Sequence, residues 1–415
     1  MRAGLPNQGD RHGPRGGERA MEVQQRVDSG LSRAFLTGDD AVAHAVRQSN
    51  VDLVAAYPIT PQTVIVERIA EFAANGKFKG EFVPVESEHS AMSACIGGAL
   101  TGARVFTATA SQGLALMHEM LYAASGLRLP IVMAVANRAL NSPLNIHGDH
   151  SDIMGSRDSG WILLFAENVE EAYDRVIQAF RIAEAVNLPV AVNLDGFTLT
   201  HSAEVVRMLP DDAVESFVGR PPRRPTLLDD PPKSFGLMSL PDTYQFFKED
   251  QQRAMEGAPP AIRAVEEAYR KISGREYGPV KRFLSDDADI VMVMLGSYAG
   301  TARVAAAQLR SEGIRAGVVS LGWYRPFPAD ELLRAVEGAD SIVVMDRSVS
   351  YGASAHPLAS DVMAALYKAG LRKRVLSVVY GLGGRWFTEE DAKRLFRHAA
   401  EPGPDFESFF YYGGD

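Results

Sequence analysis

The stretch Tyr57-Pro58-Ile59-Thr60-Pro61 follows an apolar run (51–57), and Glu86-Ser87-Glu88-His89-Ser90-Ala91 follows a second one (82–85). Each run is short enough to be a buried strand, and each stretch after it is typical of a turn that leads into a helix. The first stretch presents a threonine hydroxyl and the second a carboxylate. In open α/β sheets, ligands bind at the carboxyl ends of the strands. The two stretches therefore predict an α/β fold with Thr60 and Glu88 at its ligand-binding edge.

Length and composition narrow the class of protein. The chain has 415 residues, which is too long for one ordinary core and predicts two domains. Apolar residues make up 46% and charged residues 23% of the chain, as in soluble globular proteins. The net charge of -9 argues against a nucleic-acid-binding surface. No apolar run approaches the roughly 18 residues that a membrane-spanning helix needs.

Cys95 is the only cysteine in the sequence, so the chain cannot form an internal disulfide. It also cannot hold an iron–sulfur cluster alone, because such clusters are bound by about four thiolates. Cys95 falls in an apolar helical segment, where we expect a buried structural thiol. Residues 1–33 lack apolar periodicity and predict a flexible tail, with Met21 as an alternative start. The tail has no hydrophobic segment typical of secretory signals, so we expect a cytoplasmic protein.

Residues 34–200 alternate short apolar runs with segments of helical periodicity. The expected strands are 52–57, 81–85, 104–108, 131–136, 162–165 and 190–194. The expected helices are 41–48, 61–74, 87–100, 113–125 and 169–186, the first capped by Asp39 and Asp40 and the third by Ser87. This alternation predicts a parallel sheet with helices on both faces.

Three further segments follow. Residues 201–287 contain ten prolines and predict a connector that runs over the surface, with helices at 243–255 and 261–272. In 288–400 the alternation resumes and predicts a second, smaller α/β domain. Its expected strands are 290–295, 316–321, 341–345 and 375–380, and its expected helices are 302–311, 329–336, 355–369 and 389–397. The tail 401–415 is rich in Phe and Tyr, so we expect it to dock on this chain or on a partner.

Polar residues also follow the third and fourth expected strands. Thr107-Ala108-Thr109-Ala110-Ser111-Gln112-Gly113 forms a turn rich in hydroxyls, and Asn137-Arg138 comes after the next strand. The cluster His147-Gly148-Asp149-His150-Ser151-Asp152 lies a few residues further on. All should converge on the same sheet edge. A guanidinium beside a hydroxyl suits a ligand with a carboxylate, because the arginine fork binds it with two hydrogen bonds.

Each candidate also has a structural interpretation. Thr60 is a suitable cap for a helix that begins at Pro61, and Glu86 and Glu88 favour a helix N-terminus electrostatically. Arg138 is equally suited to a structural ion pair. The Asp and His residues of 147–152 are only weak evidence for a metal site, because alternating polar residues are common in loops. No metal ligand is predicted in this chain.

Eight motifs stand in an order that resembles a known family. They are Tyr57-Pro58-Ile59-Thr60-Pro61, Glu86-Ser87-Glu88-His89-Ser90-Ala91, Ser111-Gln112-Gly113-Leu114, Ala136-Asn137-Arg138-Ala139-Leu140, Arg157-Asp158-Ser159-Gly160-Trp161, Tyr324-Arg325-Pro326-Phe327-Pro328, Met345-Asp346-Arg347-Ser348 and Tyr380-Gly381-Leu382-Gly383-Gly384-Arg385. Together they resemble the α subunit of 2-oxoacid:ferredoxin oxidoreductases, the pyruvate synthase group. The resemblance covers 35–398. Each motif alone is weak evidence, whereas the ordered set is specific.

The resemblance implies a thiamine-diphosphate-fold, pyrimidine-binding α/β domain followed by a transketolase C-terminal-like α/β domain. It also implies oxidative decarboxylation of a 2-oxoacid with coenzyme A and thiamine diphosphate. In the family a β subunit holds the diphosphate and Mg²⁺ through a Gly-Asp-Gly motif. The nearest strings here are Gly38-Asp39-Asp40 and Gly148-Asp149-His150, so this chain resembles half of an active site. Its partners would be that β subunit, γ and cluster-bearing δ-type subunits, and an acceptor such as ferredoxin.

The resemblance also implies roles for individual residues. Glu88 matches the glutamate that hydrogen-bonds the cofactor's pyrimidine ring, and Pro58 and Gln112 are expected beside it. Thr60 and Arg138 match positions that hold the substrate carboxylate.

The loop 145–149 differs from the Ile-Trp-Asn-Asp form of pyruvate enzymes, since His147 and Gly148 replace the tryptophan and the asparagine. We therefore expect His147 to contact a substrate, either pyruvate or a larger aryl 2-oxoacid such as phenylglyoxylate, with branched-chain 2-oxoacids as further candidates. A non-catalytic scaffold subunit and a transketolase-type transferase subunit are the alternative functions.

Overall fold

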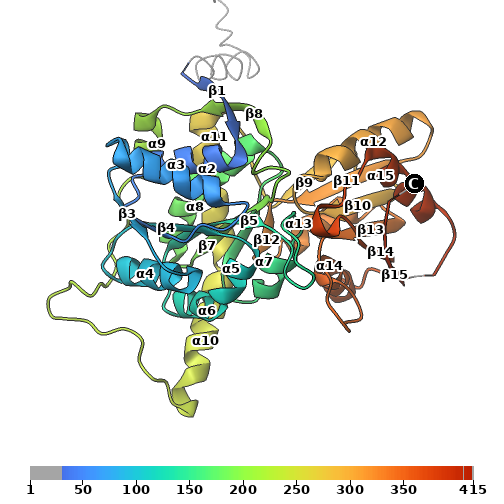
Figure 1. Ribbon diagram of the computed structural model, residues 1–415. Coiled ribbons are helices and arrows are strands. Elements are labelled where there is room, and N and C mark those ends of the chain that lie inside the picture. Colours follow the sequence, from blue (N-terminus) through green and yellow to red (C-terminus); the bar gives the residue numbers. More distant parts are fainter. Residues whose placement is uncertain (1–29, 405, 414–415) are drawn as a thin grey trace, which may run out of the picture.

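The computed structural model describes residues 30–404 and 406–413, which form two α/β domains side by side (Figure 1). The predicted α/β fold is confirmed. Residues 1–29 of the expected N-terminal tail lie outside the described residues, and Ser32 already belongs to a strand.

The first domain is built on a seven-stranded sheet in the order β12-β6-β7-β5-β4-β2-β3. Its strands are β2 (Leu53–Ala56), β3 (Glu81–Pro84), β4 (Val105–Thr109), β5 (Ile131–Asn137), β6 (Ile162–Phe165), β7 (Val190–Asp195) and β12 (Trp323–Arg325). All neighbours are parallel except β12, which runs antiparallel to β6. Strands β4 to β7 are buried along their whole length, which is typical of a parallel sheet covered on both faces.

Helices cover both faces of this sheet, as the sequence predicts. One face packs against α2 (Gly38–Gln48), α3 (Thr63–Ala74) and α8 (Val169–Val186). The other packs against α4 (Glu88–Leu100), α5 (Ser111–Leu116) and α6 (His118–Gly126), with the short α7 (Ser151–Ser156) beside α5. The expected single helix 113–125 is divided at Met117, where the backbone (φ -87°, ψ 6°) leaves the helical geometry.

The helix caps agree with the prediction in one case and differ in another. Ser87 caps α4 by accepting a hydrogen bond from Ser90 N. Helix α2 is capped by Thr37 instead of Asp39 or Asp40, because α2 begins at Gly38. Asp39 is fully buried, and burial, together with the nearby Asp40, raises its pKa well above the ordinary value.

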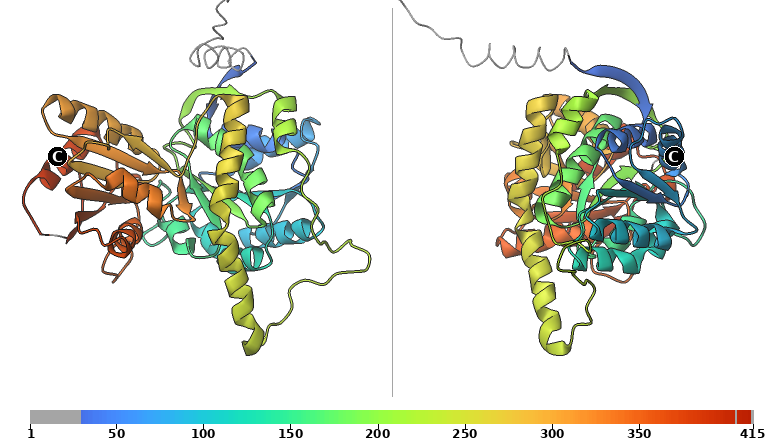
Figure 2. Two further views of the ribbon diagram at one scale, coloured as in Figure 1. Left: turned by 180° about the vertical axis from the view of Figure 1, so that it is seen from behind. Right: turned by 90° about the vertical axis from the view of Figure 1, so that its left-hand side faces the viewer.

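The proline-rich segment 201–287 contributes more to the first domain than a surface connector would. Strand β8 (Ala203–Met208) pairs with β1 (Ser32–Thr37) in an antiparallel ribbon. Helices α9 (Asp211–Val218) and α11 (Ala258–Ser273) bury apolar residues in the core around α8, among them Val214 and Ile262. Of the helices in this segment, α10 (Pro241–Glu256) is the one without a buried residue. It projects beyond the domain below α11 (Figure 2).

The second domain has a six-stranded sheet in the order β15-β14-β13-β10-β11-β9. Its strands are β9 (Val280–Phe283), β10 (Ile290–Met294), β11 (Ala316–Leu321), β13 (Ser341–Asp346), β14 (Arg374–Val379) and β15 (Phe406–Phe410). Helices α12 (Ala299–Ser311), α13 (Ala329–Val336), α14 (Pro357–Lys368) and α15 (Glu389–Ala400) cover it, and a short 3₁₀ turn, η1 (Leu382–Gly384), follows β14. The aromatic tail docks on this chain, because β15 pairs with β14.

The two domains share structure at their junction. The chain leaves the second sheet after β11, passes through Gly322 and enters the first sheet as β12. A Cβ at Gly322 would lie 2.4 Å from the Gly278 carbonyl oxygen, so only glycine fits this crossing without a shift. One apolar cluster runs across both domains and includes Trp161 and Tyr324. The domains are therefore joined by a continuous core.

A buried carboxylate, Asp195 at the end of β7, adds polar contacts across this junction. Its Oδ1 lies 2.7 Å from His150 Nε2 and 2.9 Å from Arg347 Nη1 of the second domain. Its Oδ2 accepts hydrogen bonds from the backbone N and the hydroxyl of Ser297. Burial by itself would raise the pKa of Asp195, but Arg347 and His150 hold that pKa well below its ordinary value.

We predict that Asp195→Asn destabilises the chain by about 3–5 kcal/mol at pH 7, because it leaves the buried Arg347 charge unpaired. A depressed carboxyl pKa stabilises the fold above the unfolded-state pKa of about 4, and that stability is lost as the pH falls. Urea unfolding at pH 7, 5 and 3 should therefore show a smaller acid dependence for the variant than for the wild type. The exposed Asp340→Asn variant is the control, and equal acid dependence in all three proteins would contradict this assignment.

Candidate active site

Glu88 is held at the edge of the sheet as a nearly buried carboxylate. It is the first residue of α4 and is 6% exposed. A Cβ on Gly113 would lie 2.5 Å from Glu88 Oε1 and 2.6 Å from Thr109 Oγ1, so these three residues are in close contact. Within the described part of the chain, no group donates a hydrogen bond to the Glu88 carboxylate. A buried carboxylate of this kind calls for a donor from elsewhere.

Other polar groups at this edge are also left without partners. Gln62 is fully buried and donates from Nε2 to the carbonyls of Tyr57 and Ala108, which ties the turn after β2 to β4. Its Oε1 has no hydrogen-bond partner among the described residues. The same is true of Thr109 Oγ1 and Gln112 Nε2. Because buried polar atoms are almost always hydrogen-bonded, this concentration of orphaned atoms marks the edge as a ligand site.

Thr60 does not cap the helix that follows it. Helix α3 begins at Thr63, and its N-cap residue is Gln62. The Thr60 side chain is exposed, while the Thr60 carbonyl accepts a hydrogen bond of 2.9 Å from Arg138 Nη1. The structure thus brings Thr60 and Arg138 together, as the sequence analysis expected. Pro58, two residues earlier, is exposed on the same turn.

Arg138 is 6% exposed and is not part of an ion pair among the described residues. Its Nε donates to the Asn145 carbonyl at 3.0 Å, and its backbone N donates to Asp152 Oδ2. Burial lowers the pKa of Arg138, and Asp152 partly opposes this shift. With Nε and Nη1 bound to carbonyls, Nη2 is the guanidinium nitrogen left without a partner among the described residues.

The cluster 147–152 supports the fold more than it forms one site. Asp152 accepts hydrogen bonds from the backbone N of Ser111 and of Arg138, and burial raises its pKa to about 6. His150 binds Asp195, as described above. His147 is exposed, and its ring lies 5.1 Å from that of Phe197. No group of three acidic, His or Cys side chains among the described residues is placed to hold a metal ion.

Two residues that shape this edge were missed by the sequence analysis. Gln62 follows Pro61 directly, but its two hydrogen bonds reach the turn residue Tyr57, 5 positions away, and Ala108 in β4, 46 positions away. Asn145 contacts both Arg138 and the second domain. Neither belongs to a local pattern that would have indicated such contacts. Cys95 is fully buried, and burial raises its pKa to about 12, in keeping with the expected structural thiol.

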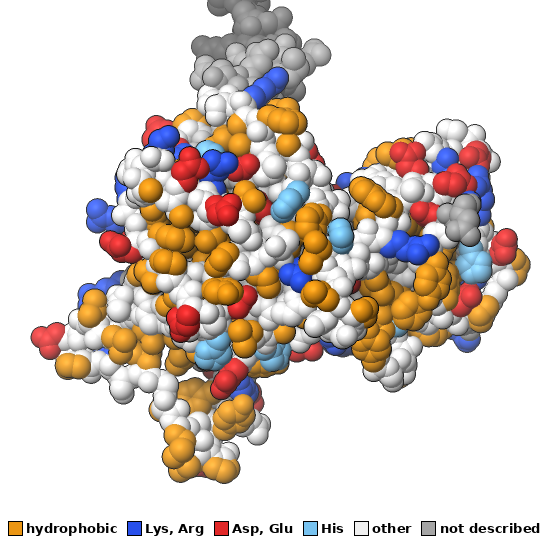
Figure 3. Space-filling model, in the orientation of Figure 1, with side chains coloured by type: hydrophobic (Ala, Val, Ile, Leu, Met, Phe, Trp, Pro, Cys, Tyr) orange, Lys and Arg blue, Asp and Glu red, His pale blue; other side chains and the backbone are white. Residues whose placement is uncertain are grey.

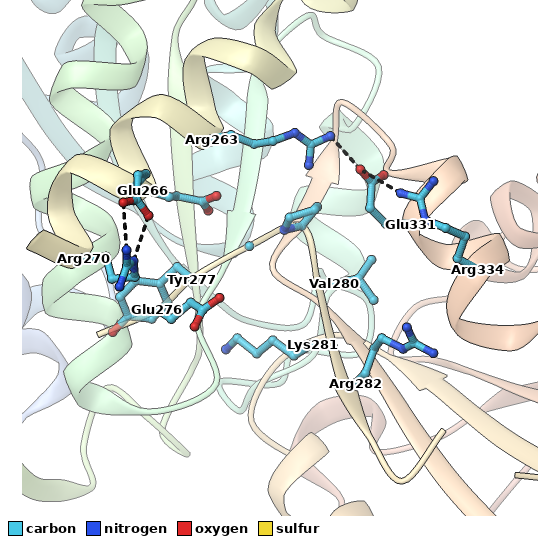
Figure 4. A pocket seen from close by; sticks show the side chains of 13 residues that line it. Arg263, Glu266, Arg270, Glu276, Tyr277, Val280, Lys281, Arg282, Glu331 and Arg334 are labelled. Carbon is cyan, nitrogen blue, oxygen red and sulfur yellow. Dashed lines mark hydrogen bonds and ion pairs between the residues drawn. The ribbon is translucent and has the colours of Figure 1, made fainter. Parts of the chain in front are cut away.

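A separate charged cleft of about 850 Å³ lies between α11, β9 and α13 (Figure 4). Arg263 and Arg334 both face Glu331 there, at 2.6 Å and 3.6 Å. Lys281 lies 2.5 Å from Glu171. These cations therefore already have carboxylate partners. The Arg263–Glu331 and Lys281–Glu171 pairs each connect the first domain to the second. No helix in the described part of the chain has the length and apolar character needed to cross a membrane.

Comparison with known proteins agrees with this geometry. Residues 44–267 match the family model for pyruvate flavodoxin/ferredoxin oxidoreductase, thiamine diphosphate-binding. Residues 288–392 match the model for pyruvate:ferredoxin oxidoreductase core domain II. The chain is 48% identical to pyruvate synthase subunit PorA of Thermotoga maritima over 372 residues, which cover 89% of this chain and 95% of that protein. It is 45% identical to ketoisovalerate oxidoreductase subunit VorA of Pyrococcus abyssi, with 88% and 92% covered.

Solved structures show the same fold at low identity. A 2-oxoglutarate:ferredoxin oxidoreductase from Magnetococcus marinus superposes with a TM-score of 0.68 at 18% identity, over 90% of this chain and 66% of that one. A split-gene transketolase, described as an inactive beta4 tetramer, superposes with a TM-score of 0.52 at 15% identity, over 88% and 98%.

The fold and the family models together define the class: an α/β chain that contains a thiamine diphosphate-binding type of domain. More narrowly, the chain belongs to the 2-oxoacid:ferredoxin oxidoreductase family and is of the α type, a subunit of a multi-subunit oxidoreductase.

We predict that Gly113→Ala displaces the Glu88 carboxylate by about 1 Å. The added Cβ would lie 2.5 Å from Glu88 Oε1, whereas ordinary van der Waals contact needs about 3.5 Å. The clash involves two movable side-chain ends, so the fold should survive at a cost of about 1–3 kcal/mol. A crystal structure and a thermal melt of the variant measure both effects. Gly97→Ala in the same α4 helix meets no atom within 4 Å and should instead stabilise by about 0.5–1 kcal/mol. An unmoved Glu88 in the Gly113 variant would contradict the close packing.

Proposed function

We propose that this chain is the α subunit of a thiamine-diphosphate-dependent 2-oxoacid oxidoreductase and contributes half of its active site. The observation that carries the proposal is the nearly buried Glu88 carboxylate, which has no hydrogen-bond donor among the described residues. The donor would be a protonated ring nitrogen of the cofactor's pyrimidine. Gly113 fits this arrangement, because any larger residue would fill the space at the carboxylate.

The residues at this edge suit the cofactor in other ways. Buried Gln62 and Thr109 and half-buried Gln112 have polar atoms without partners in the described chain, so hydrogen-bonding capacity remains for the polar groups of the ring. When bound, thiamine diphosphate supplies a carbanion nucleophile and an electron sink. Glu88 would hold a proton between its carboxylate and the ring nitrogen, which a dry site favours. Pro58 and Gln112 are the further residues proposed beside the cofactor.

The substrate carboxylate would be bound by Arg138 and Thr60. Two backbone carbonyls hold the Arg138 guanidinium in place. Its remaining nitrogen, Nη2, could therefore bind an anion without a change in the side-chain conformation. The exposed hydroxyl of Thr60 lies on the turn whose carbonyl Arg138 binds. His147, on the loop that follows, is the residue proposed to contact the substrate's side chain.

The rest of the reaction requires partner chains. A single cysteine cannot hold the iron–sulfur clusters that would carry electrons to ferredoxin or another acceptor. We propose a β subunit with a Gly-Asp-Gly motif for the diphosphate and Mg²⁺, and γ and δ-type subunits for the remaining functions. Tyr57, Val83 and Leu116 flank the candidate site and are 38%, 39% and 53% exposed, which suits an edge that a partner covers. Figure 3 shows further hydrophobic side chains over this face of both domains.

The test of this function is turnover by the purified complex with coenzyme A and a viologen dye as electron acceptor. Relatives named for pyruvate and for ketoisovalerate are 48% and 45% identical to this chain, so both 2-oxoacids belong in the panel together with phenylglyoxylate. We expect dye reduction that depends on both coenzyme A and a 2-oxoacid, with pyruvate or 2-ketoisovalerate fastest. Faster turnover of phenylglyoxylate would show that the loop 145–149 admits an aryl group. Absence of turnover with every 2-oxoacid would refute the proposal.

We predict that Glu88→Gln lowers turnover by roughly 10²–10⁴-fold, because an amide of the same shape cannot hold the proton. The complex should still assemble, since no hydrogen bond or ion pair among the described residues uses the Glu88 carboxylate and the amide has the same shape. Stopped-flow or steady-state dye reduction and gel filtration of the complex measure the two effects. Glu86→Gln, on an exposed residue two positions earlier, is the matched control and should retain wild-type turnover. Near-normal turnover of the Glu88 variant would exclude Glu88 from the chemistry.

A further inference from the structure

The loop that contains Asn145 is held from one side by the second domain. Asn145 Nδ2 donates to the Gly383 carbonyl at 3.1 Å, and Asp149 Oδ2 accepts from Gly383 N at 3.1 Å. The Gly148 carbonyl accepts hydrogen bonds from Gly384 N and from Arg347 Nη2. The loop of the first domain and the turn η1 of the second are thus joined by a short ladder of hydrogen bonds.

From its other side the same loop holds Arg138. The Asn145 carbonyl accepts the hydrogen bond from Arg138 Nε, and Asn145 Oδ1 accepts one from His147 N at 2.7 Å. Asn145 therefore uses its side-chain amide to fix its own backbone against the second domain. The backbone carbonyl of Asn145, held in this way, accepts the hydrogen bond that orients the Arg138 guanidinium.

The contact between loop and turn is close. Gly383 has a φ of +59°, and a Cβ there would lie 2.4 Å from Asn145 Nδ2. At Gly384, with φ +80°, a Cβ would lie 2.4 Å from the Cβ of His147. Small movements of η1 at Gly383 and Gly384 would be transmitted to the loop, because the two segments are in direct contact there.

We propose that Asn145 is a positioning residue through which the second domain sets the direction of the Arg138 guanidinium and so the affinity for the 2-oxoacid carboxylate. The inference rests on the function proposed above for Arg138. It predicts that changes on either side of the Asn145–Gly383 contact weaken binding of the 2-oxoacid carboxylate through Arg138.

A double-mutant cycle on the assembled complex tests this coupling. Asn145→Ala keeps the backbone carbonyl but loses the amide contact, so we expect KM to rise roughly tenfold, with kcat little changed. Arg138→Ala should raise KM further. If Asn145 acts through Arg138, the double variant should behave like Arg138→Ala alone, whereas a separate structural role would give additive effects. Asn75→Ala, at an exposed helix end, is the matched control.

A change in the second domain provides an independent test. Gly383→Ala adds a Cβ that collides with the Asn145 side chain. It should raise KM as Asn145→Ala does, although the sequence of the first domain is unchanged. Gly370→Ala carries a similar backbone strain, with φ +68°, but meets no atom within 4 Å, and its KM should stay at the wild-type value.

Additive effects in the cycle, or an unchanged KM in either the Asn145 or the Gly383 variant, would overturn the inference while leaving the proposed function intact. Unchanged kinetics in Arg138→Ala alone would instead remove Arg138 from the site, and the inference with it.

Discussion

The arrangement of the two domains depends on a carboxylate buried between them. Asp195 ends β7, an interior strand of the first sheet, and is 2% exposed, so its charge is tolerable only with partners. Those partners come from both sides: His150 from the first domain, and Arg347 and Ser297 from the second. Arg347 in turn binds the Gly148 carbonyl. One buried charge thus fixes the junction and the loop beside the candidate site.

A second constraint operates at the sheet edge, where Gly113 allows α5 to approach Glu88 and Thr109. The glycine leaves space beside the Glu88 carboxylate and the Thr109 hydroxyl. No group among the described residues donates a hydrogen bond to the carboxylate, and the hydroxyl has no partner among them. Such an arrangement is costly for a chain on its own. It becomes favourable when a ligand supplies the missing donors, which is the basis for the cofactor site proposed at this edge.

The cysteine content limits what this chain can contribute to such an enzyme. This chain belongs to a family of multi-subunit oxidoreductases, yet it has one cysteine, and that thiol is fully buried with a raised pKa. The groups proposed for acid–base chemistry and for anion binding, Glu88 and Arg138, follow the ends of strands β3 and β5. The second domain meets this edge through its turn η1, which packs against the loop whose Asn145 carbonyl binds Arg138.

The sequence by itself determined the alternation of strands and helices and the edge on which the polar residues would gather. Periodicity and burial are local properties, so β2 to β7 and the placement of Thr60, Glu88 and Arg138 after strand ends could be predicted. Only the tertiary structure decided that β12 crosses into the first sheet, that Asp195 pairs with Arg347, and that Asn145 reaches Gly383 across 238 positions of the chain. These contacts join residues far apart in the chain, and their geometry depends on how the two sheets pack, which no local pattern of residues specifies.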